Sequence, residues 1–276
     1  MKPAETWFAL RVGEFRALTR GDGAETVLFL HGLTAISEAW DPTVSHLPPG
    51  RRYVALDQRG HGRSPKPESG YGPGAYVRDA LQVIAGIGRP VHVAGHSMGA
   101  RIALLLAARH PEAVRSAAII DIGPEASRAN IRATVSAIAA RPERFASREE
   151  AFSFAFRARK PSDEDRRLFL ARLEDARDGS LTWRAPRHSL EQTVNSHRGQ
   201  SYWQDWRRIN LPALFIHGGA SSEVSMPIAE KMCAENPRVR FERYEGIGHN
   251  IPLLAPERLA ESLQAFWASL PPGGMT

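Results

Sequence analysis

Gly95-His96-Ser97-Met98-Gly99 is the stretch that decides the fold of this 276-residue chain. The residues before it, 90–94, form a largely apolar run, and the residues after it, 100–109, are rich in Ala and Leu. This context predicts a strand, a sharp turn and a helix in direct succession. Glycine suits both ends of the turn, because a side chain at either position would clash with the neighbouring backbone.

Ser97 stands at the tip of the predicted turn, where its hydroxyl is exposed. A Gly-x-Ser-x-Gly pattern between a strand and a helix is typical of a nucleophile elbow. The helix that follows also directs free backbone N–H groups toward the place where negative charge would develop. The sequence therefore predicts that Ser97 is a nucleophile, provided that a base and an acid lie elsewhere in the chain.

The composition is that of an ordinary globular protein, with 42% hydrophobic and 24% charged residues. The length allows one large α/β domain with an insertion. The formal net charge is +6, but the arginines alternate with acidic residues, as in residues 141–150 and 163–178, so we expect no nucleic-acid partner. Cys233 is the only cysteine, which excludes a disulfide framework and a thiolate metal cluster.

The chain shows no signal for secretion or for the membrane. Its first residues lack the basic stretch and apolar core of a secretory signal, and no apolar run approaches the roughly 18 residues of a membrane span. We therefore expect a cytoplasmic enzyme without a membrane partner, present as a monomer or a homodimer.

Apolar strands and amphipathic helices alternate over the first 122 residues. This alternation predicts a mainly parallel sheet with helices on both faces, whose functional residues gather at the carboxyl ends of the strands. The expected strands are residues 7–12, 14–18, 26–30, 52–56, 90–94 and 116–120, and the expected helices are residues 37–47, 74–88 and 100–109.

The alternation stops between residues 123 and 208. Helical periodicity without buried-strand runs, together with dense aromatics, predicts an inserted helical cap over Ser97. The expected cap helices are residues 131–140, 149–158, 163–176 and 190–196. The sheet pattern then resumes at residues 213–217 and 239–244, with helices at 226–235 and 256–270. The expected domains are thus a core of residues 1–122 and 209–276 and a helical cap of residues 123–208.

Four features of the chain together resemble the α/β-hydrolase superfamily over nearly the whole length. They are His31-Gly32, the polar turn Asp-Gln-Arg-Gly-His-Gly-Arg-Ser at 57–64, the elbow at 95–99 and Gly-Ile-Gly-His at 246–249. The resemblance implies the α/β-hydrolase fold, a mostly parallel sheet with helices on both faces and an inserted cap. It implies hydrolysis by a serine, a histidine and an acid, and it leaves the substrate open.

The resemblance makes His249 the catalytic base, because it lies between the last expected strand and the last expected helix. An imidazole suits this role, since it can accept the Ser97 proton and return it to the leaving group near neutral pH.

The acid is where the chain departs from the common pattern. Many members of the superfamily carry an Asp in a Gly-x-x-Asp loop, but residues 218–223 here read Gly-Gly-Ala-Ser-Ser-Glu. Asp121 ends the preceding core strand, and the chain resembles most a branch that takes its acid from that position. Glu223 lies in the loop itself, one or two positions late, with a longer and more mobile side chain. We expect Asp121 to be the acid and keep Glu223 as the alternative.

The resemblance implies acyl transfer to Ser97, with the oxyanion held by the backbone N–H groups of Leu33 and Met98. Water then hydrolyses the acyl-enzyme with the same base, and no metal or organic cofactor is needed. The expected partner is thus a small-molecule substrate.

The substrate class stays broad at this stage: a small carboxylic ester, a lactone or an activated amide. The resemblance favours a substrate that bears a carboxylate, with which the arginines of the expected cap are compatible (Arg157, Arg159, Arg166 and Arg167). Two alternatives stay open. One is a ligand-binding receptor on the same fold with vestigial activity, and the other is a C–C bond hydrolase.

Overall fold

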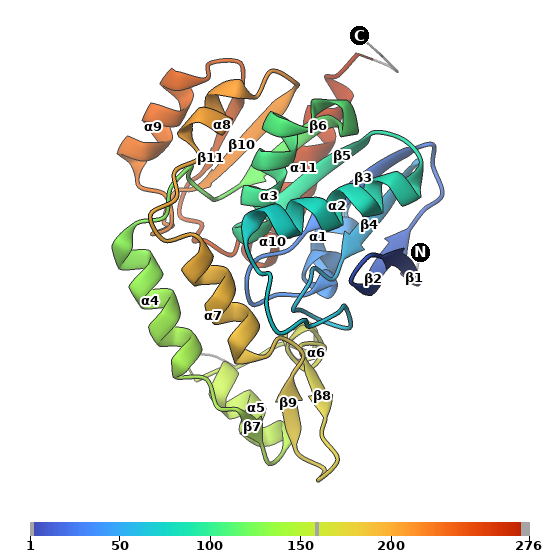
Figure 1. The fold of residues 1–276 in the computed structure, drawn as a ribbon, viewed down its shortest axis with the longest axis vertical. Helices are drawn as coiled ribbons and strands as arrows, with labels where there is room; N and C mark the ends of the chain where they lie inside the picture. Colours follow the sequence, from blue (N-terminus) through green and yellow to red (C-terminus); the bar gives the residue numbers. More distant parts are fainter. Residues whose placement is uncertain (1–2, 158–159, 272–276) are drawn as a thin grey trace.

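An eight-stranded sheet forms the centre of the protein in the computed structural model, which describes residues 3–157 and 160–271 (Figure 1). The strand order is β1-β2-β4-β3-β5-β6-β10-β11. The strands are β1 (Ala4–Leu10), β2 (Gly13–Arg20), β3 (Glu25–Leu30), β4 (Arg51–Leu56), β5 (Val91–His96), β6 (Val114–Ile120), β10 (Ala213–Gly218) and β11 (Arg240–Tyr244).

The sheet is mostly parallel, which confirms the predicted fold class. Only β2 pairs antiparallel with its neighbours, β1 on one side and β4 on the other, and the remaining pairs from β4 to β11 are parallel. Parallel strands in succession bring the residues after β5, β6 and β10 to the same edge of the sheet. The predicted site residues Ser97 and Asp121 follow two of these strands directly.

Helices cover both faces of the sheet. One face carries α2 (Pro73–Ile87), α3 (Met98–Arg109), α8 (Trp203–Arg208) and α9 (Met226–Glu235), and the other carries the 3₁₀ turn η1 (Ser37–Trp40), α1 (Asp41–Ser45), α10 (Ile251–Leu254) and α11 (Pro256–Ala268). A second 3₁₀ turn, η2 (Pro111–Ala113), leads into β6. No helix of the described residues is long and apolar enough to span a membrane.

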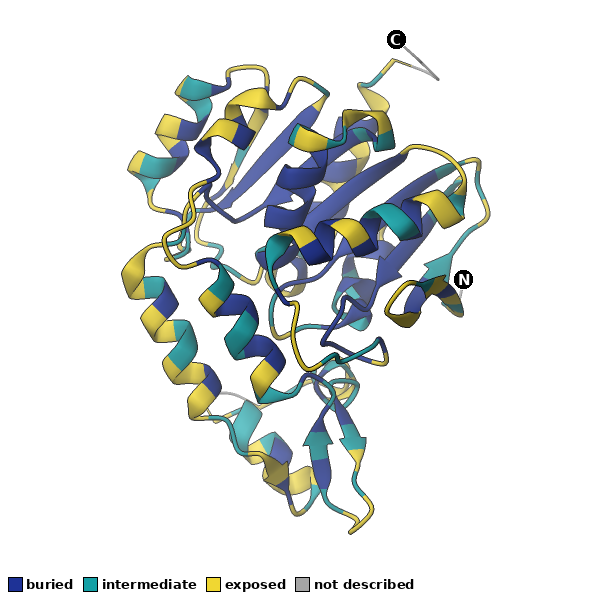
Figure 2. Cartoon of the chain, viewed as in Figure 1, coloured by how far each residue is buried: buried dark blue, intermediate teal, exposed yellow. Residues whose placement is uncertain are grey.

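The central strands are buried on both faces, as Figure 2 shows. In β3, Leu28 and Leu30 join the apolar cluster under α2 and α3, whereas Val27 and Phe29 join the cluster under α1 and α11. Burial on both sides explains why β3 is a continuous apolar run rather than an alternating one.

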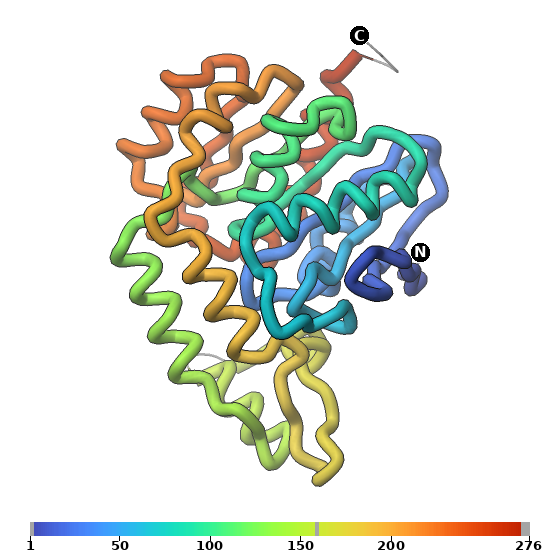
Figure 3. The backbone as a smooth tube through the Cα atoms, in the orientation of Figure 1, coloured from blue at the N-terminus to red at the C-terminus, as the bar shows by residue number. Residues whose placement is uncertain are grey.

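The chain between β6 and β10 forms a separate layer beyond the carboxyl edge of the sheet. It contains α4 (Arg128–Ala139), α5 (Arg148–Ala155), α6 (Asp163–Leu170) and α7 (Arg187–Ser196), and α4 and α7 lie side by side (Figure 3). It also contains a small sheet of β7 (Arg144–Phe145), β9 (Leu181–Trp183) and β8 (Leu173–Asp175). The prediction of a purely helical segment is therefore wrong, because strands of two or three residues are too short to show an alternating pattern.

This layer begins and ends at one place on the core. Glu125 and Ser201 form an isolated antiparallel bridge, and the Tyr202 amide donates to the Pro124 carbonyl at 2.7 Å. The next element, α8, packs against α3 and α9, and the indole of Trp206 donates to the Met232 carbonyl at 2.8 Å. The segment outside the core thus spans residues 125–201, here called the inserted segment. It ends before α8, earlier than the expected boundary at residue 208.

Candidate active site

Ser97 lies in the tight turn that joins β5 to α3. Its φ of 53° is positive, a conformation that costs a residue with a side chain about 1–3 kcal/mol. A side chain on Gly95 would collide with the Gly99 carbonyl, and one on Gly99 would collide with the Leu30 carbonyl. These close approaches explain both glycines of the motif and leave the Ser97 side chain at the carboxyl edge of the sheet.

Asp121 occupies a matching turn after the neighbouring strand β6. Its φ is 52°, and among the described residues only Asp121 and Ser97 combine a side chain with positive φ. The two turns continue the parallel ladder, because the Ser97 amide donates to the Ile120 carbonyl at 2.9 Å and the Asp121 amide donates to the Ile216 carbonyl at 2.8 Å. Two strained residues side by side at one sheet edge are typical of a functional site.

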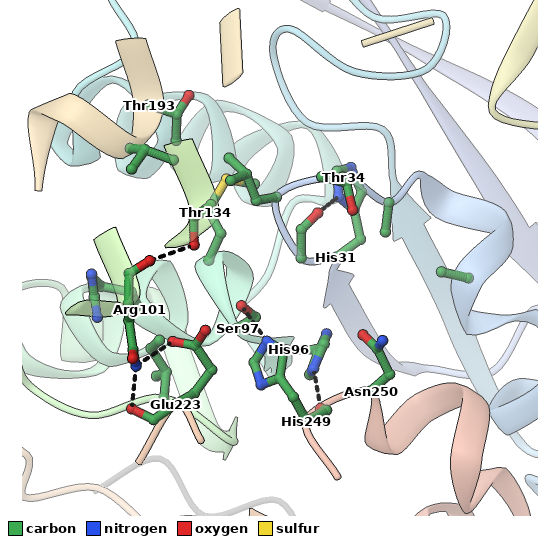
Figure 4. Close-up of a pocket in the computed structure, with 18 of the residues that line it drawn as sticks. His31, Thr34, His96, Ser97, Arg101, Thr134, Thr193, Glu223, His249 and Asn250 are labelled. Atoms are coloured by element: carbon green, nitrogen blue, oxygen red, sulfur yellow. Dashed lines mark hydrogen bonds between the residues drawn. The ribbon is translucent and has the colours of Figure 1, made fainter. Parts of the chain in front are cut away.

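A chain of hydrogen bonds connects Ser97, His249 and Asp121. The Ser97 Oγ lies 2.9 Å from His249 Nε2, and His249 Nδ1 lies 2.7 Å from Asp121 Oδ2. Figure 4 shows the imidazole beside Ser97 at the pocket. Because Nδ1–H donates to the carboxylate, Nε2 carries the lone pair and accepts from the Ser97 hydroxyl. The arrangement can remove the Ser97 proton and stabilise the imidazolium that forms.

The Asp121 carboxylate is fully buried and accepts hydrogen bonds from three donors. His249 and the Ser221 hydroxyl, at 2.5 Å, donate to Oδ2, and the Gly218 amide donates to Oδ1 at 2.8 Å. Burial by itself would raise the pKa of Asp121. The hydrogen bonds from His249, Ser221 and Gly218 outweigh burial and hold the pKa below its ordinary value, so the carboxylate stays ionised.

Ser221 stands at the fourth residue of the Gly-x-x-Asp loop, where many members of the superfamily carry their acid. An Asp at this position would bring a second carboxylate against Asp121, whereas serine supplies a donor. The alternative acid, Glu223, faces elsewhere: its Oε2 lies 3.4 Å from the Asn130 amide nitrogen, and no contact between Glu223 and His249 is present in the described chain. Serine at position 221, in place of the usual Asp, is therefore the sequence signal that the acid comes from another strand end, that of Asp121.

Leu33 and Met98 line the same pocket as Ser97. Within residues 3–157 and 160–271, neither amide donates a hydrogen bond to the protein. His61 fixes the Leu33 peptide, because its Nε2 contacts the Leu33 carbonyl while its Nδ1 lies 2.9 Å from the Arg59 carbonyl. Both amides are therefore available to an oxyanion.

His96, inside the elbow motif, supports the base rather than the nucleophile. Its Nε2–H donates to the His249 carbonyl at 2.8 Å, and the centroids of the two rings lie 4.8 Å apart. Burial lowers the pKa of His96 to about 4, so its ring is neutral at pH 7. The contact holds the loop that carries His249, a role that the motif alone does not reveal.

A cavity of about 250 Å³ opens above Ser97, between the core and the inserted segment. The core contributes the loops after β3, β5, β10 and β11, and the inserted segment contributes α4 and α7. Figure 4 shows Arg101, Thr134 and Glu223 on one side of Ser97 and Thr34 and Asn250 on the other. The described residues hold no cluster of three or more His, Cys, Asp or Glu side chains able to bind a metal.

The arginines that the sequence proposed for substrate lie away from this cavity. Arg157 is exposed beside Phe154, Arg166 faces Asp163 at the surface, and Arg167 pairs with Glu164 and Asp41. Arg159 lies outside the described residues. The three described arginines do not line the pocket, so they give no support to a carboxylate-bearing substrate.

The comparisons with known proteins agree with this geometry. A 2-(acetamidomethylene)succinate hydrolase of Mesorhizobium japonicum is 28% identical over 87% of both chains. An esterase of Mycobacterium tuberculosis is 26% identical over 91% of this chain and 86% of its own. A crystal structure of an E-2-(acetamidomethylene)succinate hydrolase superposes with a TM-score of 0.89 at 25% identity, over 97% of this chain and all of the other.

The family model described as the alpha/beta hydrolase fold matches residues 25–256, which include the elbow, Asp121 and His249. The match extends from β3 to the start of α11 and so contains the inserted segment. The chain therefore belongs to the α/β-hydrolase family, and it is an enzyme of the hydrolase type.

Proposed function

We propose that the protein is a serine hydrolase that cleaves a small ester, lactone or activated amide through an acyl-enzyme on Ser97. The observation that carries the proposal is the continuous hydrogen-bond chain from Ser97 through His249 to Asp121 beside a cavity. The relatives named above are hydrolases, which fits the same chemistry.

The reaction runs in two acyl transfers. His249 Nε2 takes the proton as Ser97 Oγ attacks the carbonyl carbon, and the amides of Leu33 and Met98 hold the oxyanion. The imidazolium, stabilised by Asp121, then protonates the leaving group as its bond to the acyl carbon breaks. A water molecule then attacks the acyl carbon while His249 takes one of its protons. His249 returns this proton to Ser97 Oγ as the bond between Oγ and the acyl carbon breaks, and the acid leaves.

The size of the cavity supports a small substrate. Its volume of about 250 Å³ lies just below the range of about 300–1,000 Å³ that is common for ligand pockets. The inserted segment acts as a cap, because α4 and α7 supply one wall of this cavity. We therefore expect short acyl chains to fit this cavity better than long ones, so acyl length should limit turnover.

Turnover of a series of 4-nitrophenyl esters tests the proposal. Acetate and butyrate esters should be hydrolysed faster than the octanoate ester, and boiled enzyme should show only the background rate. Small lactones and amides of acidic compounds then narrow the substrate class. If the folded protein hydrolyses none of these compounds, the proposal is wrong.

Replacing Ser221 with alanine should lower kcat by about tenfold to a hundredfold, because Asp121 loses one hydrogen bond of the kind made to a charged group. The expected loss is smaller than for Asp121 itself, since His249 and Gly218 still donate. Steady-state kinetics with the butyrate ester measure it. Ser222 is an exposed neighbouring serine, so Ser222→Ala is the matched control. An equal loss of kcat in Ser222→Ala would show that the hydrogen bond from Ser221 to Asp121 is not the cause.

The same variant has an expected pH signature. Because the folded pKa of Asp121 lies below its ordinary value of about 3.9, its hydrogen bonds stabilise the protein above that pH. This contribution is lost as the pH falls through the folded pKa. The difference in unfolding free energy between wild type and Ser221→Ala should thus be largest near neutral pH and shrink below about pH 4, which urea unfolding at several pH values can measure. A difference that grows toward acidic pH would contradict the assignment.

A further inference from the structure

Arg101 is a buried cation in the wall of the proposed active site. It lies one helical turn after Ser97 on α3, and its amide donates to the Ser97 carbonyl at 3.1 Å. Only 4% of the residue is exposed, and it lines the cavity that contains Ser97 and His249.

The guanidinium of Arg101 is incompletely paired. Within the described residues its only side-chain hydrogen bond runs from Nη2 to the Gly123 carbonyl at 3.1 Å. Nε is buried without a partner, and the guanidinium carbon lies 5.5 Å from the centroid of the Tyr202 ring. A guanidinium carries five N–H donors, so most of these donors are unused.

The carboxylate that interacts electrostatically with Arg101 is that of Glu223, which also lines the cavity. It forms no ion pair with Arg101 within 4 Å in the described chain, and Asn130 contacts it instead. His197, another cavity residue, is neutral because burial lowers its pKa to about 3. A buried charge without a paired anion is costly, and burial accordingly lowers the pKa of Arg101, although an arginine stays protonated at neutral pH.

We infer that Arg101 is a specificity residue that binds a carboxylate of the substrate, so that the enzyme prefers acyl compounds bearing a second, free carboxylate. Arg101 lines the cavity that also holds the nucleophile, and a carboxylate is the anion that matches the planar guanidinium. Glu223 lies on the same side of the cavity and repels any anion that binds there, so the pairing with Arg101 has to outweigh this repulsion (Figure 4). The inference rests on the proposed serine hydrolase function and names its substrate class.

Two esters with matched acyl chains test this role. The 4-nitrophenyl monoester of glutaric acid and 4-nitrophenyl valerate have acyl chains of equal length that end in a carboxylate and a methyl group. Wild type should show a higher kcat/KM for the glutarate ester, after subtraction of its spontaneous hydrolysis. In Arg101→Met this preference should fall by about tenfold to a hundredfold, mainly through KM, and Arg101→Lys should retain part of it.

The controls separate local binding from general effects. Arg166→Met removes the same charge from the surface of the inserted segment and should leave the preference as in wild type. The rate at which a neutral fluorophosphonate labels Ser97 in each variant reports whether the elbow is folded. The inference is wrong if wild type shows no preference for the glutarate ester. It is also wrong if Arg101→Met lowers kcat/KM equally for both esters while labelling is unchanged. In both cases the hydrolase proposal stands. If wild type hydrolyses neither of these esters and none of the compounds in the earlier series, the hydrolase proposal itself fails.

Discussion

Ser97→Ala is expected to lower kcat for small esters by about 10⁴-fold or more. The alanine removes the atom that would form the bond to the acyl carbon, and His249 then has no hydroxyl to deprotonate. The remaining rate comes from binding and from the Leu33 and Met98 amides, which still stabilise an oxyanion formed by attack of water. Steady-state kinetics with the butyrate ester, at enzyme concentrations high enough to detect the residual rate, measure the loss.

The fold should survive this change. Alanine has the same Cβ as serine, so the strain at φ 53° is the same in both proteins, and the glycines on either side are unaltered. Thermal unfolding followed by circular dichroism should therefore give nearly the wild-type Tm. Activity that persists in a folded Ser97→Ala protein would exclude the acyl-enzyme mechanism.

Asp121→Asn should lower kcat by about 10⁴-fold with the active-site geometry largely kept. An amide nitrogen facing His249 Nδ1 favours the tautomer that carries the proton on Nε2, which then cannot accept the proton of Ser97. The variant also loses the charge that stabilises the imidazolium. Glu223→Gln is the matched control, and it should cost little because Glu223 makes no contact with His249 in the described chain.

A second substitution can move the acid rather than remove it. Ser221 lies beside Asp121, so Ser221→Asp in the Asp121→Asn background places a carboxylate next to the original position. This double variant should recover part of the lost kcat, whereas Ser221→Asp alone should be impaired by two adjacent carboxylates. A large loss of kcat in Glu223→Gln, together with full activity in Asp121→Asn, would show that Glu223 is the acid.

The parts of the fold that the sequence predicts well are those whose signal is long or sterically strict. The strands β3 and β5 are largely apolar because both of their faces are buried, and the glycines of the elbow are required by the approach of the Gly99 and Leu30 carbonyls. Each of these features constrains several successive residues. The order of strands and helices along the core therefore follows from the sequence.

The inserted segment is harder to predict, because its elements are short and its order depends on packing. The strand β8 falls inside a stretch with helical periodicity, and its pairing with β9 fixes it as a strand. The helix α8 lacks a clear periodic pattern over its six residues. It belongs to the core because its own residues Trp203 and Trp206 are buried in the core cluster. Tertiary contacts decide both assignments.

The site shows the same limit. Ser97 and His249 follow from motifs, but the choice between Asp121 and Glu223 depends on which carboxylate reaches His249 Nδ1, a distance that no motif encodes. The donor from Ser221 and the unpaired guanidinium of Arg101 appear only once the loops after β6 and β10 are brought beside α3. The sequence draws attention to the arginines of the expected cap, whereas the buried arginine in the cavity wall is Arg101, four residues after the nucleophile.

The central claim is that Ser97 forms a covalent bond with the acyl group of the substrate. Mass spectrometry of the protein after reaction with a fluorophosphonate tests it most directly, because the reagent traps a serine activated by a neighbouring base. We expect one adduct per chain, located by peptide sequencing on Ser97 and absent in Ser97→Ala, with strongly slowed labelling in Asp121→Asn. An adduct on another residue of the wild-type protein, or labelling that is equally fast in Ser97→Ala, would contradict it.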